Sequence, residues 1–173
     1  MRNSVGCICV LTGFSGSAIN ANIYYTGQLF VKDTQVRQSG NGLYFSKYGD
    51  MSSTATIDNS RFENNVTGVN VDDSGRVVVR NSVIARNSGS GVSVGGVGTG
   101  DAIVLLENSM INANPTGIWS CPCGPTGGRV RLSNTTLAFN DTALSGPNIV
   151  SYGNNQMSDN TTNGAIASTQ ARQ

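Results

Sequence analysis

The residues of this sequence that could do chemistry are four aspartates in segments rich in glycine and serine: Asp50, Asp72, Asp73 and Asp101. Two carboxylates that face one groove at a suitable separation can hydrolyse a glycosidic bond. Arg76 is the basic residue that would assist an elimination reaction at the same place, with Lys47 as the alternative. These residues form the candidate catalytic set. The simpler interpretation is that the aspartates are solvated turn residues, because Asp is common in turns.

The same aspartates are also candidate metal ligands. Carboxylates, together with backbone carbonyls from glycine-rich loops, are the ligands that Ca²⁺ requires. No spacing among Asp50, Asp72, Asp73 and Asp101 is diagnostic in the way that an EF-hand loop is. We therefore expect no required cofactor, and Ca²⁺ is the one cofactor hypothesis that the sequence supports.

A second set of residues is suited to binding. Tyr44, Asn70 and Trp119 occupy equivalent outward positions in a repeat described below. Aromatic rings stack on sugar rings while amides bond the sugar hydroxyls, so these three are the candidate carbohydrate-binding residues. Two alternatives stay open: loop residues fold over the rings, or Trp119 packs on Cys121 and Pro122.

Composition excludes several other chemistries. The sequence has no histidine, which removes Ser-His-Asp and Cys-His nucleophile systems and His-ligated metals. With a net charge of +1 and only 12% charged residues, the protein lacks the positive electrostatic potential that would hold a nucleic acid. No run of about 18 apolar residues is present to span a bilayer. The apolar patch near the N-terminus is too short and too interrupted by glycine for a clear signal peptide.

The four cysteines form two Cys-x-Cys pairs, Cys7/Cys9 and Cys121/Cys123. Zinc sites use longer spacers, so a zinc shared by the two pairs is a weak hypothesis. A local Cys121–Cys123 disulfide, or free thiols, fits the spacing better.

All of these residues are positioned by a repeat of 20 to 27 residues. An apolar anchor is followed three positions later by a small or polar residue, usually Asn, and then by Gly and another apolar residue. The anchors are Leu11, Val36, Phe62, Ile84, Ile111, Leu137 and Met157. The second apolar column is Ile19, Leu43, Val69, Val92, Ile118 and Leu144. Self-similarity at this period marks units that stack, because one unit alone cannot bury its apolar face.

Short strands and polar corners complete each unit. A strand with period-2 alternation precedes each anchor, and in the last units its inward residues are Val130 and Leu132, then Val150 and Tyr152. One corner column is Asp33, Asn59, Asn81, Asn108, Asn134 and Asn154, and the other is Ser39, Asn65, Asn87, Asn114, Asn140 and Asn160. Asn tolerates left-handed backbone at tight corners, and stacked amides bond to the coils above and below. We expect internal amide ladders in both columns, with Asn81 buried.

With these columns, the sequence resembles right-handed parallel β-helix repeat proteins of the pectate-lyase-like superfamily over about residues 7 to 166. The resemblance implies an all-β fold, a right-handed parallel β-helix of about six to seven short coils. It assigns residues 1–166 to a single domain that starts in mid-coil and leaves residues 167–173 as a flexible tail. Many members are polysaccharide lyases, glycoside hydrolases or surface proteins, so the resemblance favours an exported or cell-surface location. This sequence lacks the catalytic constellations of those enzymes.

We therefore expect a non-catalytic or cryptic β-helix module that presents a flat Asn/Ser/aromatic face and a loop edge to a glycan or protein partner. One alternative is a polysaccharide lyase or glycoside hydrolase that uses the clustered aspartates named above, Asp50, Asp72, Asp73 and Asp101, at the loop edge. Another is a fragment of a longer β-helix protein. No amphipathic helix closes the first coil, and an open coil exposes apolar side chains and strand edges. We expect a homodimer or larger homo-oligomer, with Val10, Leu11, Phe14 and Ile19 as the contact.

Overall fold

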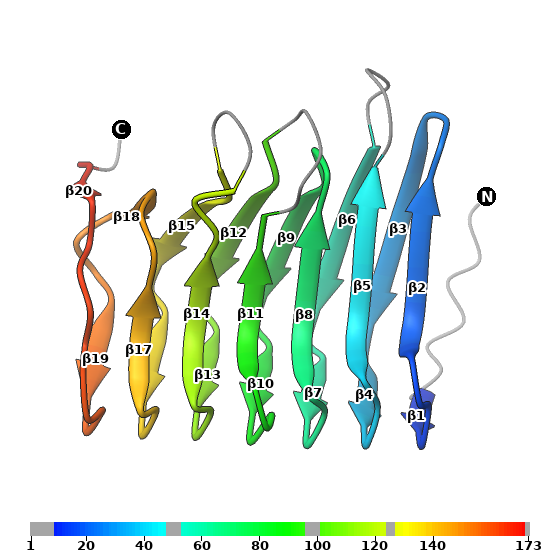
Figure 1. Cartoon of the computed structure of the whole chain (residues 1–173), viewed down its shortest axis with the longest axis horizontal. Helices are drawn as coiled ribbons and strands as arrows, with labels where there is room; N and C mark the ends of the chain where they lie inside the picture. Colours follow the sequence, from blue (N-terminus) through cyan, green and yellow to red (C-terminus); the bar gives the residue numbers. More distant parts are fainter. Residues whose placement is uncertain (1–8, 48–52, 96–100, 124–126, 172–173) are drawn as a thin grey trace.

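The chain winds into a parallel β-helix, in which three parallel sheets enclose one narrow apolar core (Figure 1). The computed structural model describes residues 9–47, 53–95, 101–123 and 127–171. Each coil adds one strand to each sheet in turn, so neighbouring strands of a sheet lie one coil apart in the sequence. No helix long and apolar enough to cross a membrane occurs in these ranges.

The three sheets, named A, B and C in the order in which the chain visits them, contain seven, six and seven strands. Sheet A consists of β1 (Cys9–Thr12), β4 (Thr34–Arg37), β7 (Arg61–Glu63), β10 (Val83–Ala85), β13 (Met110–Asn112), β16 (Thr136–Ala138) and β19 (Gln156–Ser158). Sheet B consists of β2 (Ser17–Ile23), β5 (Asn41–Lys47), β8 (Thr67–Asp72), β11 (Ser90–Val94), β14 (Thr116–Ser120) and β17 (Thr142–Ser145). Sheet C consists of β3 (Gly27–Lys32), β6 (Ser53–Asp58), β9 (Arg76–Arg80), β12 (Ile103–Glu107), β15 (Arg129–Ser133), β18 (Ile149–Ser151) and β20 (Ser168–Thr169). The expected fold class and approximate coil number are confirmed.

The two predicted apolar columns are confirmed as backbone partners. Leu11 pairs with Val36, and the anchor column continues without a slip to Met157. The second column pairs in the same way from Ile19 to Leu144. The middle members of both columns have no exposed surface, so the repeat seen in the sequence is the core of the protein.

Strand β18 departs from the predicted register by one residue. Val130 pairs with Ile149 and Leu132 pairs with Ser151, so Val150 lies beside the outward Arg131. The prediction that Val150 and Tyr152 point inward is therefore wrong. An alternating strand allows either register, and a shift of one residue exchanges its two faces. Here the side chain of Ile149, which is fully buried, fills the core instead.

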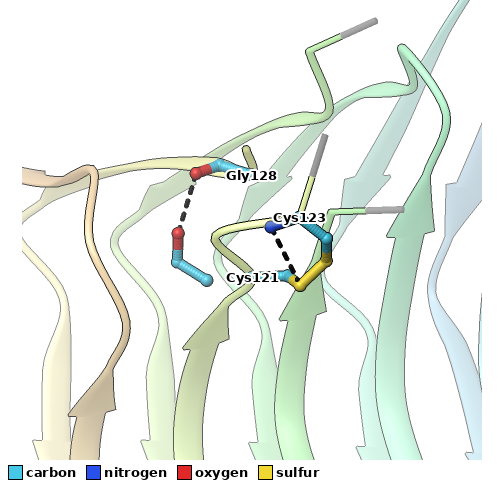
Figure 2. The surroundings of a disulfide bond; sticks show 4 residues. Cys121, Cys123 and Gly128 are labelled. Atoms are coloured by element: carbon cyan, nitrogen blue, oxygen red, sulfur yellow. Dashed lines mark hydrogen bonds between the residues drawn. A yellow bond between two sulfur atoms is a disulfide. The ribbon is translucent and has the colours of Figure 1, made fainter. Parts of the chain in front are cut away.

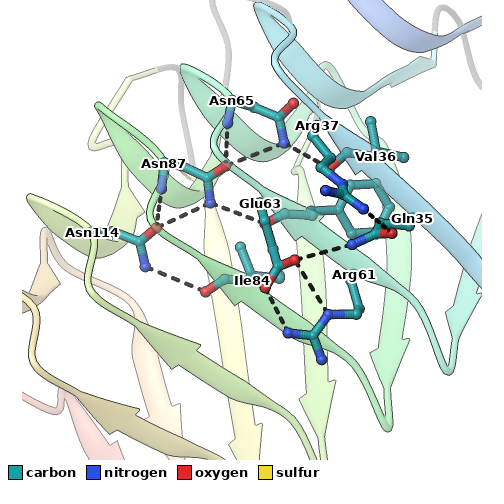
Figure 3. Close-up of polar contacts among 10 residues, drawn as sticks. Gln35, Val36, Arg37, Arg61, Glu63, Asn65, Ile84, Asn87 and Asn114 are labelled. Atoms are coloured by element: carbon teal, nitrogen blue, oxygen red, sulfur yellow. Dashed lines mark hydrogen bonds and ion pairs between the residues drawn. The ribbon is translucent and has the colours of Figure 1, made fainter. Parts of the chain in front are cut away.

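The second corner column forms the expected internal amide ladder (Figure 3). The side-chain amide of each Asn donates to the Oδ1 atom of the Asn one coil further on, from Asn65 to Asn160. It also donates to a backbone carbonyl of the preceding coil. The left-handed backbone falls on the residue before each Asn, for example Arg86 at a φ of 52°. The ladder Asn is therefore selected for its hydrogen bonds and not for its φ angle.

The first corner column behaves in the opposite way. Its members from Asp33 to Asn134 adopt left-handed φ angles of 46° to 52°, as predicted. However, Asn81 is exposed, so the prediction of a buried amide there is wrong. The buried polar row is one position later, where the hydroxyls of Ser60, Ser82 and Ser109 accept from backbone N–H groups of the preceding coil. Small hydroxyl side chains fit this tight corner and satisfy buried backbone donors.

Cys121 and Cys123 form a disulfide within the connection between β14 and β15 (Figure 2). The backbone N–H of Cys123 also donates to the sulfur of Cys121 at 3.2 Å. Nearby, the Ser120 hydroxyl donates to the Gly128 carbonyl at 2.7 Å, which closes the base of this connection. Of the two sequence alternatives, free thiols and a local disulfide, the structure has the disulfide.

Candidate functional site

The candidate carbohydrate-binding residues lie in one straight row on the outer face of sheet B. Tyr44 pairs with Asn70, Asn70 with Ser93, and Ser93 with Trp119, on four consecutive coils. We call this row, with Ser145 after Trp119, the sheet B face. Trp119 is 38% exposed, and Tyr44 and Asn70 are half-buried. Hydrogen-bonded strands fix the spacing of these side chains, so the row is rigid before any ligand arrives.

The connections from sheet B to sheet C form the loop edge (Figure 1). Two of them, β11–β12 and β14–β15, are longer than any connection from sheet C to sheet A or from sheet A to sheet B. Between β8 and β9 the chain turns through Asp73 and Ser74, both with positive φ angles, and the Gly75 N–H donates to the Asp72 carbonyl. Positive φ at both central residues is the geometry of a type I′ turn. A Cβ at Gly75 would lie 2.8 Å from the Val71 side chain, so only Gly fits. This turn fixes the backbone positions of Asp72 and Asp73, and β9 starts directly after it at Arg76.

The sheet B face and the loop edge meet at Tyr44 and Asp72. The Tyr44 hydroxyl donates a hydrogen bond to the Asp72 carboxylate on the next coil. Burial raises the pKa of Asp72, the charge of Asp73 raises it further, and the Tyr44 hydrogen bond opposes both effects. A carboxyl with a raised pKa beside a second carboxylate is the arrangement from which general acid catalysis is built.

Asp73 lies against the preceding coil. Its Oδ2 atom accepts from the Ser46 hydroxyl at 3.5 Å, and its carbonyl accepts from the Lys47 N–H at 3.1 Å. Its Oδ1 atom is buried and has no hydrogen-bond partner among the described residues. Lys47 is thus held beside Asp73 through its backbone, while Arg76 is exposed at the start of β9.

Asp101 makes a different contact from Asp72 and Asp73. The Asp101 carboxylate forms an ion pair with Arg129, the first residue of β15. No group of three or more metal-ligating side chains gathers in the described ranges. Asp50 lies outside the described residues. The Ca²⁺ hypothesis stays a prediction, and Asp72 and Asp73 are its adjacent described members.

Sequence reasoning missed an ion pair on the outer face of sheet A, between the buried Glu63 and the exposed Arg61 (Figure 3). Glu63 is only 6% exposed, and its carboxylate accepts from Arg61 at 2.6 Å and from Gln35 at 3.3 Å. Gln35 in turn accepts from Arg37. The hydrogen bond from Arg61 lowers the pKa of Glu63, while burial acts in the opposite direction. Only the spacing of two residues between Arg61 and Glu63 pointed to this pair.

The candidate oligomer contacts occupy the first coil. Val10 is 54% exposed and Phe14 is 43% exposed, whereas Leu11 and Ile19 are partly buried and pack against the core. β1 and β2 are terminal strands of sheets A and B, and β3 is the terminal strand of sheet C. The first described coil therefore carries apolar side chains next to the edge of every sheet.

Comparison with known proteins gives one match. A family model described as a right-handed β-helix region matches residues 9–171 of the chain. Neither the curated proteins nor the solved structures contain a significant match. The matched range covers all the strands described above, so the comparison concerns the fold as a whole and assigns no role to an individual side chain.

Proposed function

Because the chain belongs to the right-handed β-helix family, we propose that it is a non-catalytic binding module that holds a glycan against the sheet B face. The observation that supports this proposal is the row of Tyr44, Asn70, Ser93 and Trp119 on consecutive coils. An exposed indole ring can stack on the apolar face of a sugar. The amide of Asn70, two coils from Trp119, and the hydroxyl of Ser145, on the next coil, can bond the sugar hydroxyls at fixed spacing.

The test uses the fact that the sequence contains a single tryptophan. Titration with neutral and acidic oligosaccharides should change the fluorescence of Trp119 for at least one of them. Trp119→Leu should abolish that binding. The matched control is Phe139→Leu, because Phe139 is also an exposed aromatic residue, 64% accessible, and lies outside the sheet B face. Oligosaccharide binding that survives Trp119→Leu, or an extended peptide that binds there in place of sugars, would reject the proposal.

A second candidate function is the cleavage of a polysaccharide at the loop edge, and the raised pKa of Asp72 beside Asp73 favours it. Asp72 would act as the general acid and Asp73 as its partner carboxylate, with Arg76 or Lys47 as the basic residue of a lyase. The test is release of reducing ends or unsaturated products from a polysaccharide panel, with added Ca²⁺ and with a chelator. Asp72→Asn should abolish cleavage, and Asp141→Asn, at an exposed corner, should not.

We also propose that the protein self-associates through the first coil, with Val10, Leu11, Phe14 and Ile19 at the contact. The exposed side chains of Val10 and Phe14 lie beside terminal strands whose backbone groups can pair with a second copy. A two-fold arrangement is the commonest way in which such a contact closes.

A further inference from the structure

The outer side of sheet C carries three straight rows of side chains on β3, β6, β9 and β12, which lie side by side (Figure 1). The start row is Gln28, Thr54, Arg76 and Ile103. The middle row is Phe30, Thr56, Val78 and Leu105. The end row is Lys32, Asp58, Arg80 and Glu107. Residues between the rows, such as Ile57 and Val79, are buried in the core, so all three rows point outward, and we call them the sheet C face.

The middle row is a mostly apolar strip with polar borders. Phe30 is 66% exposed, and Val78 and Leu105 are half-buried. On one side the end row is charged throughout, and on the other side every start-row residue except Ile103 is polar or charged. An apolar centre within a polar rim is the usual composition of a protein contact surface. The sheet C face therefore has the make-up of a docking surface.

The end row alternates in charge, from the positive Lys32 through Asp58 and Arg80 to the negative Glu107. Asp58 and Arg80 form an ion pair at 3.3 Å, which fixes the middle of the row. Neighbouring members belong to neighbouring parallel strands, so they are spaced about 4.8 Å apart. In reverse, the order of signs is negative, positive, negative, positive. The end row is therefore complementary in charge to a reversed copy of itself.

A two-fold axis can place this row opposite its own reverse. The axis lies parallel to the strands, between the two sheets and midway between β6 and β9. Two copies then pack face to face with their β-helix axes antiparallel and their strands running in the same direction, as in aligned sheet packing. Lys32 of each copy lies opposite Glu107 of the other, and Asp58 lies opposite Arg80. The two middle rows meet along their whole length.

The charges select this arrangement over its neighbours. A shift of one strand places Asp58 opposite Glu107 and Arg80 opposite itself. The shift in the other direction places Lys32 opposite Arg80 and Asp58 opposite itself. A two-fold axis along the β-helix instead places Arg80 opposite Arg76, which lies on the same strand. Like charges that face each other across a contact are costly, so the charges specify a single register.

We propose that the sheet C face docks a second copy of this chain in this antiparallel, two-fold arrangement. A parallel sheet repeats its charges at the interval of the end row, and this chain supplies one with the complementary order of signs. Other elements match the interval less well, because side chains on one face of a peptide strand repeat at about 6.6 Å and an α-helix rises about 5.4 Å per turn. The docking surface is separate from both the first coil and the sheet B face.

The area of the sheet C face sets the expected strength of docking. Four strands about 4.8 Å apart and three rows about 6.6 Å apart cover about 400 Å² per copy. Stable interfaces bury about 800 Å² per partner, so the docked pair should be weak, with a dissociation constant of about 0.1–1 mM. Analytical ultracentrifugation of the full chain from about 10 µM to about 1 mM spans this range. The species present at the lowest concentration should associate further at the highest, and its failure to do so would overturn the proposal.

Two charge variants test the register directly. Lys32→Glu places like charges opposite each other at both ends of the docked pair, and Glu107→Lys does the same. Each variant alone should therefore associate at least about tenfold more weakly than the parent. A 1:1 mixture of the two should recover the association of the parent, because both facing pairs then have opposite signs. Recovery in the mixture cannot come from a folding defect in either variant.

Matched controls lie away from the sheet C face. Arg86→Glu and Asp141→Lys make the same changes in net charge, and both residues are exposed where the chain passes from sheet A to sheet B. Each control should associate like the parent, and the species at the lowest concentration should be the same in every variant, which distinguishes this contact from the first coil. A mixture of Lys32→Glu and Glu107→Lys that stays as weak as its components, or a control as weak as either, would overturn the proposal.

Discussion

Asn87 and Asn114 lie one coil apart, and the Oδ1 atom of Asn114 accepts both the backbone N–H and the side-chain amide of Asn87, each at 3.0 Å. The Asn87 amide also donates to the Phe62 carbonyl of the preceding coil at 3.2 Å. One buried side chain thus links three coils at a corner where no strand pairs. The amide ladder continues the hydrogen bonding of the sheets around this corner.

Asn87→Ala should lower the free energy of unfolding by about 1–3 kcal/mol, because it leaves the Asn65 N–H and the Phe62 carbonyl without partners in the interior. Urea unfolding measures this change. Ser88→Ala is the control, because Ser88 is the next residue and its side chain is exposed. A loss in Ser88→Ala equal to that in Asn87→Ala would contradict the role of the ladder.

Ile118→Asp should prevent folding, since it places an unpaired charge in a core position that has no exposed surface. Ile118→Val at the same position should fold and lose about 0.5–1.5 kcal/mol, the usual effect of removing one buried methylene. Circular dichroism and urea unfolding of the two variants distinguish the cases. A folded Ile118→Asp protein of normal stability would mean that this column is not the core.

The ion pair between the buried Glu63 and the exposed Arg61 should make stability depend on pH in the acid range. The pKa of Glu63 is lower in the folded protein than its ordinary value of 4.5, so folding favours the charged form. The stabilisation is complete above pH 4.5 and is lost as the pH falls through the lower, folded-state pKa. Glu63→Gln should therefore be less stable than the parent at neutral pH, and the difference should shrink in acid. Glu107→Gln, whose carboxylate makes no ion pair among the described residues, should not show this pattern.

Reduction of the Cys121–Cys123 disulfide should change global stability by less than about 2 kcal/mol. The effect is small because the two cysteines are only two positions apart in the sequence. The closed loop is therefore short and restricts few conformations of the unfolded chain. Thermal unfolding with and without a thiol reductant measures it, and the Cys123→Ser variant gives a second estimate. A large loss of stability in both would show that the connection between β14 and β15 supports the core.

Self-association should depend on the first coil. Light scattering of the reduced protein at micromolar concentration should give a dimer or larger species, and Leu11→Asp should convert it to a smaller one. Val66→Asp is the control, since Val66 is 55% exposed on a corner of the third coil. A monomeric parent, or an oligomer unchanged by Leu11→Asp, would exclude the proposed contact.

The sequence by itself determined the fold, because each coil repeats the same apolar and polar positions. Stacking then forces equivalent residues, such as Val36 and Phe62, to become partners. The same reasoning placed Tyr44, Asn70 and Trp119 in one row.

Only the tertiary structure decided which polar groups are buried and which are paired. Asn81 and Asn87 are both corner amides in the sequence, yet one is exposed and the other is enclosed, because the two corners turn their side chains in opposite directions. Asp101 pairs with Arg129, Asp72 accepts a hydrogen bond from Tyr44, and β18 lies one residue out of the predicted register, so that Ile149 is buried. These outcomes depend on contacts between coils, which a repeat pattern along the chain does not specify.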